Sequence, residues 1–120
     1  MFRQFSEQVV SDLHANTDLT DLLDASAVSA LISEQEDGES FVNYFVMFDA
    51  SASKDGAKNW QVKIESWSDT YDKSIAIADE VTNALEASSN YYDYISGKSE
   101  PVRIESKTFI ITTQIFNIKK

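Results

Sequence analysis

The segment Phe41 to Phe48 constrains the fold most, because its composition predicts a β-strand with apolar residues on both faces. Successive side chains of a strand point to opposite sides of its sheet, so even-numbered and odd-numbered positions form separate faces. The apolar even-numbered residues are Val42, Tyr44, Val46 and Phe48, and the apolar odd-numbered residues are Phe41, Phe45 and Met47. We therefore expect this strand in a layered structure that covers each of its faces.

Two further patterns follow this strand. A polar stretch from Ser51 to Asn59 leads into Trp60 to Glu65, whose alternation of apolar and polar residues predicts a half-buried strand. The two strands together predict a hairpin with a long loop. Residues Tyr71 to Ala87 then change to a helical period, directly after the capping candidates at 68–70, and predict a long amphipathic helix.

The two ends of the chain add further elements. An apolar stripe at helical spacing predicts a helix over residues 2–15, and Leu19, Leu22 and Leu23 predict one or two helical turns that close over it. The other expected elements are a strand at 28–32, a strand at 91–95, a turn at 96–101 and a final strand at 108–118.

This order of elements favours an α+β fold, because helices are separated from runs of adjacent strands. We expect a mainly antiparallel sheet of four to five strands with two main helices packed on one face. The chain has 120 residues, which is the size of one ordinary domain, so we expect residues 1–120 to form a single domain.

Acidic residues dominate the charge. Twenty acidic and ten basic residues give a formal net charge of -10, which disfavours the basic surface that nonspecific DNA binding requires. Residues 1–53 hold ten acids and one base, whereas residues 54–120 hold ten acids and nine bases. Nearly all of the imbalance therefore lies in the first part of the chain.

Cysteine is absent, which excludes disulfides, thiolate catalysis and cysteine-based metal sites. No apolar run approaches the roughly 20 residues of a membrane span. The first seven residues also lack the apolar stretch of a signal peptide. We therefore expect a protein that is made in the cytoplasm and has no membrane partner.

Few residues suggest catalysis. His14, the only histidine, lies off the apolar stripe of the first helix. Ser51 and Lys54 have the Ser-x-x-Lys spacing of penicillin-recognising enzymes, but they lie in a polar loop and the partner motifs of that family are missing. The three glycines stand apart, so a phosphate-binding loop has no support. We therefore expect that the protein is not an enzyme and that it binds no cofactor.

The acidic segment at 34–39 has two interpretations. Its carboxylates could gather a hard cation such as calcium, but their spacing does not match an EF-hand loop. The simpler interpretation is a solvated acidic loop, and we expect no metal site. The residues concerned are Glu34, Glu36, Asp37 and Glu39.

The second face of the aromatic strand predicts self-association. If both helices pack on one side of the sheet, Phe41, Phe45 and Met47 remain on the other side, joined by Trp67. Such an apolar patch is larger than monomers usually expose, so we expect it to form a subunit interface. The alternative is that the N-terminal helix covers one face of the sheet and the central helix covers the other.

The segment from Gln61 to Ser89 resembles the small tail-terminator proteins of long-tailed bacteriophages, also called tail-completion or head-to-tail joining proteins. In that family a strand of the form Val-x-Ile-x-x-Trp-Ser runs into a helix rich in alanine, isoleucine and valine. The matching residues here are Val62, Ile64, Trp67 and Ser68, followed by Ala76, Ile77, Ala78, Val81, Ala84 and Leu85. The N-terminal helix, the aromatic strand and the closing strand also fall in the family's order.

This resemblance implies a structural virion protein that forms a ring, typically of six copies, on the head-proximal end of a finished tail tube. The ring would stop tube elongation and present the surface on which the head-tail connector docks, while DNA passes through without specific binding. The loop residues Lys54, Asp55, Lys58 and Asn59 are candidates for contact with the tube or the connector. The acidic residues Glu34, Glu36, Asp37 and Glu39 are candidates for the lumen or the rim.

A different class of function is a small cytoplasmic binding or adaptor domain without enzymatic activity. Tyr91, Tyr92 and Tyr94 would then hold a ligand or a peptide. The same tyrosines also fit a strand that carries aromatic residues at its edge.

Overall fold

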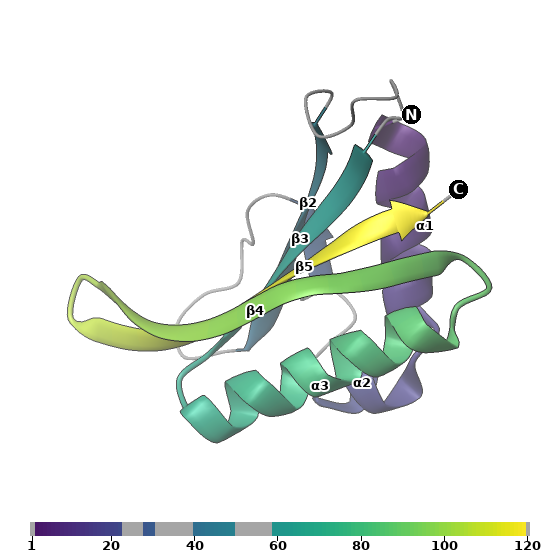
Figure 1. Cartoon of the computed structure of the whole chain (residues 1–120). Helices are drawn as coiled ribbons and strands as arrows, with labels where there is room; N and C mark the ends of the chain where they lie inside the picture. Colours follow the sequence, from purple (N-terminus) through teal and green to yellow (C-terminus); the bar gives the residue numbers. More distant parts are fainter. Residues whose placement is uncertain (1, 23–27, 31–39, 50–58, 120) are drawn as a thin grey trace.

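The computed structural model describes residues 2–22, 28–30, 40–49 and 59–119 (Figure 1). Three helices and five strands lie in these ranges. In chain order they are α1 (Phe2–His14), α2 (Thr17–Leu22), β1 (Val28–Ala30), β2 (Phe41–Asp49), β3 (Asn59–Ser68), α3 (Tyr71–Ala87), β4 (Tyr91–Ile104) and β5 (Lys107–Lys119).

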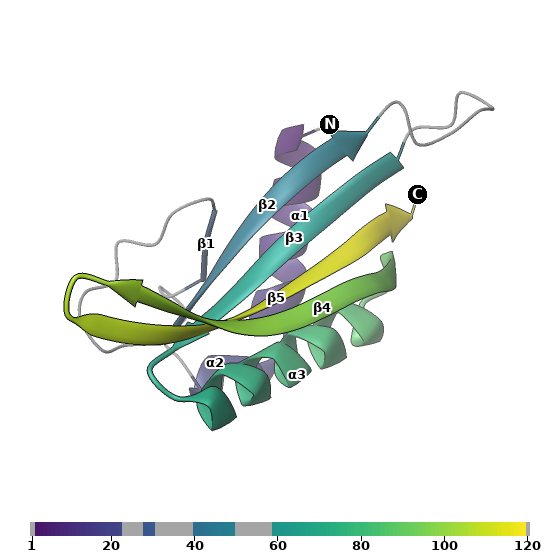
Figure 2. The same ribbon diagram turned by 60° about the vertical axis from the view of Figure 1, so that its left-hand side comes forward.

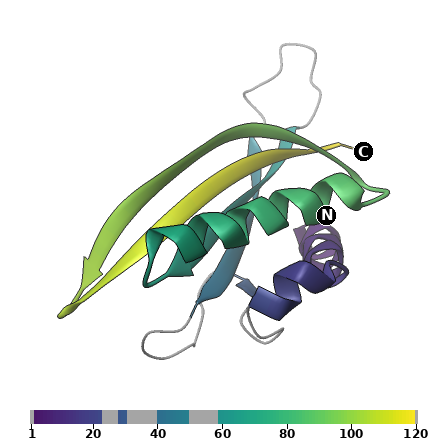
Figure 3. The same ribbon diagram turned by 90° about the horizontal axis from the view of Figure 1, so that it is seen from below.

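The strands form one sheet in the order β1-β2-β3-β5-β4. Strands β2, β3, β5 and β4 pair antiparallel, and the short edge strand β1 pairs parallel with β2. All three described helices lie on the same side of this sheet (Figures 2 and 3). The expected α+β fold, with a mainly antiparallel sheet and two main helices on one face, is confirmed.

The apolar stripe of α1 packs against the even-numbered face of β2, whereas α3 packs against β3 and β5 on the same side of the sheet. Phe5, Val9 and Leu13 follow one another at intervals of four residues, so they emerge on one side of α1, and all three are buried. The α3 helix begins at a cap in which the backbone N–H of Lys73 donates to the Thr70 hydroxyl at 3.3 Å. The predicted bounds of α3, Tyr71 to Ala87, are confirmed.

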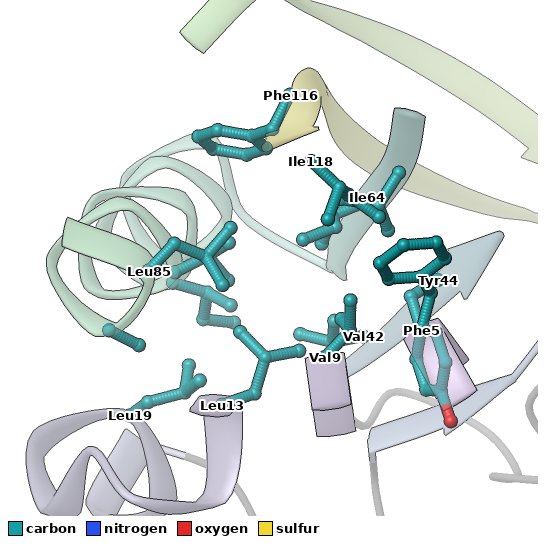
Figure 4. Packing of buried hydrophobic residues seen from close by; sticks show 14 residues of the cluster. Phe5, Val9, Leu13, Leu19, Val42, Tyr44, Ile64, Leu85, Phe116 and Ile118 are labelled. Carbon is teal, nitrogen blue, oxygen red and sulfur yellow. The ribbon is translucent and has the colours of Figure 1, made fainter. Parts of the chain in front are cut away.

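One hydrophobic cluster joins these helices to the sheet (Figure 4). It takes residues from α1, α2, α3 and the three central strands, and most of them are fully buried. The alternative in which α1 and α3 cover opposite faces of the sheet is therefore wrong. The cluster comprises Phe5, Val9, Leu13, Leu19, Val42, Tyr44, Val62, Ile64, Ile77, Val81, Ala84, Leu85, Phe116 and Ile118.

The expected turn at 96–101 is wrong. Strand β4 continues through this segment to Ile104 and pairs with β5 along its length, and the reversal occurs at Glu105, whose φ is 57°. Pro101 resembles a turn signal, but β4 is an edge strand, where a missing backbone N–H is tolerated. A side chain at Gly97 would meet the hydroxyl of Tyr94, so a larger residue there would displace the Tyr94 side chain.

Candidate functional site

The face of the sheet that points away from the helices is the first candidate site, and we call it the open sheet face. Phe41 of β2 lies directly opposite Trp67 of β3, and their rings stack with centroids 5.1 Å apart and planes 20° apart. The ring of Phe109 in β5 also contacts Trp67, with centroids 5.7 Å apart in an edge-on arrangement. Three strands thus contribute to a continuous aromatic row, and no described helix covers it.

The open sheet face also contains the other two residues expected there. Phe45 pairs with Lys63, whose ammonium lies 5.7 Å from the centre of the phenyl ring. Met47 lies two residues further along β2 on the same face and is half-buried. The strand order therefore places Phe41, Phe45, Met47 and Trp67 on one surface, whereas their role as a subunit interface stays a prediction.

Phe109 is the member of this row that the sequence did not identify as part of the patch. Phe109 and Ile111 are two residues apart, so they share one face of a strand, but this periodicity does not say which strand lies beside β5. The pairing of Ile111 with Trp67 supplies that information, because it brings the β5 aromatic ring next to the β3 indole.

The three tyrosines near the start of β4 do not form a shared pocket. Tyr91 is 73% exposed and points to the open side, opposite Lys119. Tyr92 and Tyr94 alternate with it, so their side chains lie on the helix side. The ring of Tyr94 packs edge-on against Phe116 at 5.3 Å. This arrangement gives no support to a ligand site made from the three tyrosines.

Tyr92 instead fastens the edge strand β4 to α1. Its hydroxyl donates to Asp12 at 2.6 Å and accepts from the side-chain amide of Gln8 at 3.0 Å, while the Asn90 side chain also donates to Asp12. Burial, the hydrogen bond to Asp12 and the charge of that carboxylate raise the pKa of Tyr92 far above its ordinary value, although Gln8 opposes this. The Tyr92 phenol therefore stays protonated and donates its hydrogen bond to Asp12.

Replacing Tyr92 by phenylalanine should lower the free energy of unfolding by about 1–2 kcal/mol at pH 8, because Asp12 loses a donor. The unfolded chain releases the tyrosine proton near pH 10, whereas the raised pKa in the folded chain retains it. The stabilisation that the Tyr92 hydroxyl contributes is therefore complete below about pH 10, and it is lost as the pH rises above this value. Urea unfolding between pH 8 and pH 11 should show the difference between the two proteins shrinking.

Tyr91→Phe is the control for this experiment, because Tyr91 is highly exposed. Its unfolding should follow that of the unmodified protein across the whole pH range. A gap between Tyr92→Phe and the unmodified protein that stays constant up to pH 11 would contradict the assignment of the proton to the Asp12 contact.

A row of hydroxyl and amide groups joins α3 to the sheet, and no pattern in the sequence predicts it. The Ser74 hydroxyl donates to the backbone carbonyl of Ser66 at 2.9 Å and lies 2.8 Å from the Thr112 hydroxyl. The Gln114 side chain donates to the Thr82 hydroxyl at 2.8 Å. These hydrogen bonds hold α3 against β3 and β5.

The second candidate site is a groove of about 340 Å³ between the end of α1, the start of α2 and the second half of α3. We call it the acidic groove, because three carboxylates line it and neither lysine nor arginine does. Among the described residues, no group of three or more histidines and carboxylates has a metal-binding arrangement. The lining residues are Asp12, Ala15, Asn16, Thr17, Asp18, Glu80, Asn83, Ala84, Ala87 and Ser88.

Asparagine side chains hold this groove together. The Asn16 amide donates to the backbone carbonyl of Glu80 at 3.1 Å and to its carboxylate at 3.3 Å, while its carbonyl accepts from the backbone N–H of Asp18 at 2.8 Å. Asn83 donates to the other carboxylate oxygen of Glu80 at 3.2 Å. Asn16 thus caps α2 and orients Glu80 at the same time.

Several predicted site residues lie outside the described part of the chain. This holds for the loop residues Lys54, Asp55 and Lys58, whereas Asn59 is the first residue of β3. It also holds for the whole acidic segment, Glu34, Glu36, Asp37 and Glu39.

Two further expectations concern residues that the structure describes. His14 lies exposed in the last turn of α1. Within the described ranges, no helix combines the length and the apolar character needed to cross a membrane.

Comparison with known proteins yields a likeness in structure rather than in sequence. No protein-family model matches the chain, and no curated protein matches it. Among solved structures, a chain of the "Virion of native gene transfer agent (GTA) particle" superimposes with a TM-score of 0.66 at 17% sequence identity. The match covers 92% of this chain and 90% of that chain. This protein therefore shares its fold, over nearly the whole length of both chains, with a component of a gene transfer agent virion.

Proposed function

We propose that this protein is a structural, non-enzymatic component of a phage-like virion, and that it acts there as a tail terminator. The observation that carries this proposal is the shared fold with a chain of a gene transfer agent virion, which extends over 92% and 90% of the two chains. The resemblance of residues 61–89 to tail-terminator proteins supports the more specific role. The chain would then form one domain that works as a single ring subunit.

The open sheet face supports assembly from several copies. The row formed by Phe41, Trp67 and Phe109 is made of large side chains, all half-buried in the single chain. Aromatic residues that keep part of their surface in water are enriched at protein interfaces, where burying them supplies much of the binding free energy. We propose that Phe41, Phe45, Met47 and Trp67 contact a neighbouring copy in a ring of six.

In this proposal the ring sits at the head-proximal end of the tail, between the tube protein and the head-tail connector. The loop with Lys54, Asp55, Lys58 and Asn59 would reach one of these partners. DNA would pass through the ring without specific binding, because a net charge of -10 per copy repels phosphates. The acidic segment with Glu34, Glu36, Asp37 and Glu39 would line the lumen or the rim.

Deletion of the gene from its phage or gene transfer agent cluster tests this proposal. We expect tubes of irregular length that exceed the normal length, together with filled heads that carry no tail, because nothing ends elongation or presents a docking surface. Electron microscopy of lysates measures both effects. Complementation with the unmodified gene is the control and should restore uniform tails, whereas tails of normal length on joined heads after deletion would contradict the proposal.

A further inference from the structure

We propose that the tip of the β4–β5 hairpin of one copy docks in the acidic groove of the next copy, with Arg103 entering among the carboxylates. This inference rests on the proposed function and specifies one contact between the ring subunits. We call residues 98–107 the arm.

The arm extends away from the rest of the molecule. All of its residues except Val102 are exposed, including Ile104 at 46%. The hairpin projects past the start of α3 at one end of the molecule (Figures 1 and 3). A two-stranded ribbon by itself is marginally stable in water, so a surface on another molecule would stabilise the regular pairing seen here.

The arm contains three basic and two acidic residues, the latter being Glu100 and Glu105, so its formal charge is +1 (3 − 2) in a protein of net charge -10. Lys98, Arg103 and Lys107 lie in it, and Lys98 forms an ion pair with Glu100 at 3.6 Å. Arg103 is exposed near the turn, and in the described part of the chain no ion pair engages its guanidinium. An arginine presents five donors in a planar fork, which suits carboxylate acceptors.

The acidic groove has the complementary charge. Asp12, Asp18 and Glu80 line it without any lysine or arginine, so their fields add inside a concave surface. Hydrogen bonds from Asn16 and Asn83 hold the Glu80 carboxylate, and Tyr92 holds Asp12. A cationic side chain would therefore meet acceptors whose orientation is already set.

The positions of the two surfaces require a second copy. The arm lies beyond the first turn of α3, whereas the groove lies beside its last two turns, at the opposite end of a molecule 47 Å long (Figure 3). The arm therefore cannot reach the groove of its own chain. A contact between two different surfaces of identical copies is head-to-tail, and such contacts produce rings when the rotation between copies closes.

Exchange of charge is the first test. Asp18→Arg and Arg103→Asp should each reduce association between copies at least tenfold in sedimentation velocity, and the chain with both substitutions should recover most of it. Asp18 is suited to this change because it is exposed at the rim of the groove. The matched controls are Glu86→Arg and Lys73→Asp, two exposed residues of α3 outside both surfaces, which should leave association unchanged.

Chemical cross-linking is the second test. It is specific for the introduced residues, because the unmodified chain has no cysteine. A mixture of Arg103→Cys and Asp18→Cys chains, treated with a short bismaleimide, should yield a covalent dimer. Arg103→Cys mixed with Lys73→Cys should not. The reaction is read both in solution and on tails isolated after complementing the deletion strain with the two variants.

The outcomes separate this inference from the proposed function. A cross-link in either setting, together with recovery in the charge exchange, supports the arm contact. If tails are uniform only when the gene is present, but no cross-link forms in either setting, the arm contact is overturned. The terminator role then stays in place. Loss of association with Asp18→Arg but not with Arg103→Asp also overturns it, because the groove then binds another basic partner. Normal tails after gene deletion refute the proposed function itself.

Discussion

The double substitution Phe41→Ser with Trp67→Ser should convert the assembled protein into monomers. These rings stack at 5.1 Å on the open sheet face and remain partly exposed in the single chain. Truncating aromatic residues at the centre of an interface typically costs 2 kcal/mol or more per residue. A loss of about 2 kcal/mol at each residue, which is about 4 kcal/mol for the pair, corresponds to a dissociation constant raised roughly 700-fold. Analytical ultracentrifugation over a concentration series measures this change.

The fold should survive this double substitution with reduced stability, because neither side chain is fully buried but Phe41 packs against the core cluster. Circular dichroism and thermal unfolding check that the monomer is folded. Tyr71→Ala is the matched aromatic control, since Tyr71 is 56% exposed at the start of α3, away from the open sheet face. A double variant that sediments and attaches to tails like the unmodified protein would refute the interface.

Replacing Phe116 by alanine should have the largest effect on stability, lowering the free energy of unfolding by about 4 kcal/mol. The Phe116 side chain is 2% exposed, lies opposite Val62 in the sheet and meets the ring of Tyr94. Its removal leaves a cavity at the point where β5, β3 and α3 come together. Because domains of this size are stable by only about 5–15 kcal/mol, the loss should be obvious in urea unfolding.

Tyr91→Ala provides the control for Phe116→Ala. Tyr91 is also an aromatic residue in the same pair of strands, but it is 73% exposed. Its replacement should cost less than about 1 kcal/mol, which is the range of intrinsic strand preferences. Equal destabilisation by the two substitutions would show that the core does not centre on Phe116 as the structure indicates.

The local elements were predictable because their signals lie within a few turns or a few alternating positions. The capped periodicity of 71–87 and the apolar stripe of 2–15 predicted α3 and α1 within a residue at each end. The prediction failed at 96–101, where glycine and proline resembled a turn. Tertiary pairing prevailed there, because β5 supplies partners along the whole of β4 and the edge position tolerates Pro101.

The candidate sites were predictable only in part. The residue pattern placed Phe41, Phe45 and Met47 on one face, but the neighbourhood of Trp67 and Phe109 depends on strand order. The acidic groove was not found, since Asp12, Asp18 and Glu80 come from three helices and are separated by up to 68 positions. The arm was missed together with the true length of β4.

By itself, the sequence determined the kind of each main element, the α+β class, the acidic first half and the apolar character of both faces of β2. These properties follow from periodicity and composition, which act over short distances along the chain. Only the tertiary structure decided that all the described helices share one face, that β5 lies between β3 and β4, and that the hairpin extends into an arm. Such features depend on contacts between residues far apart in sequence, whose pairing is selected by burial of the whole core rather than by any local pattern.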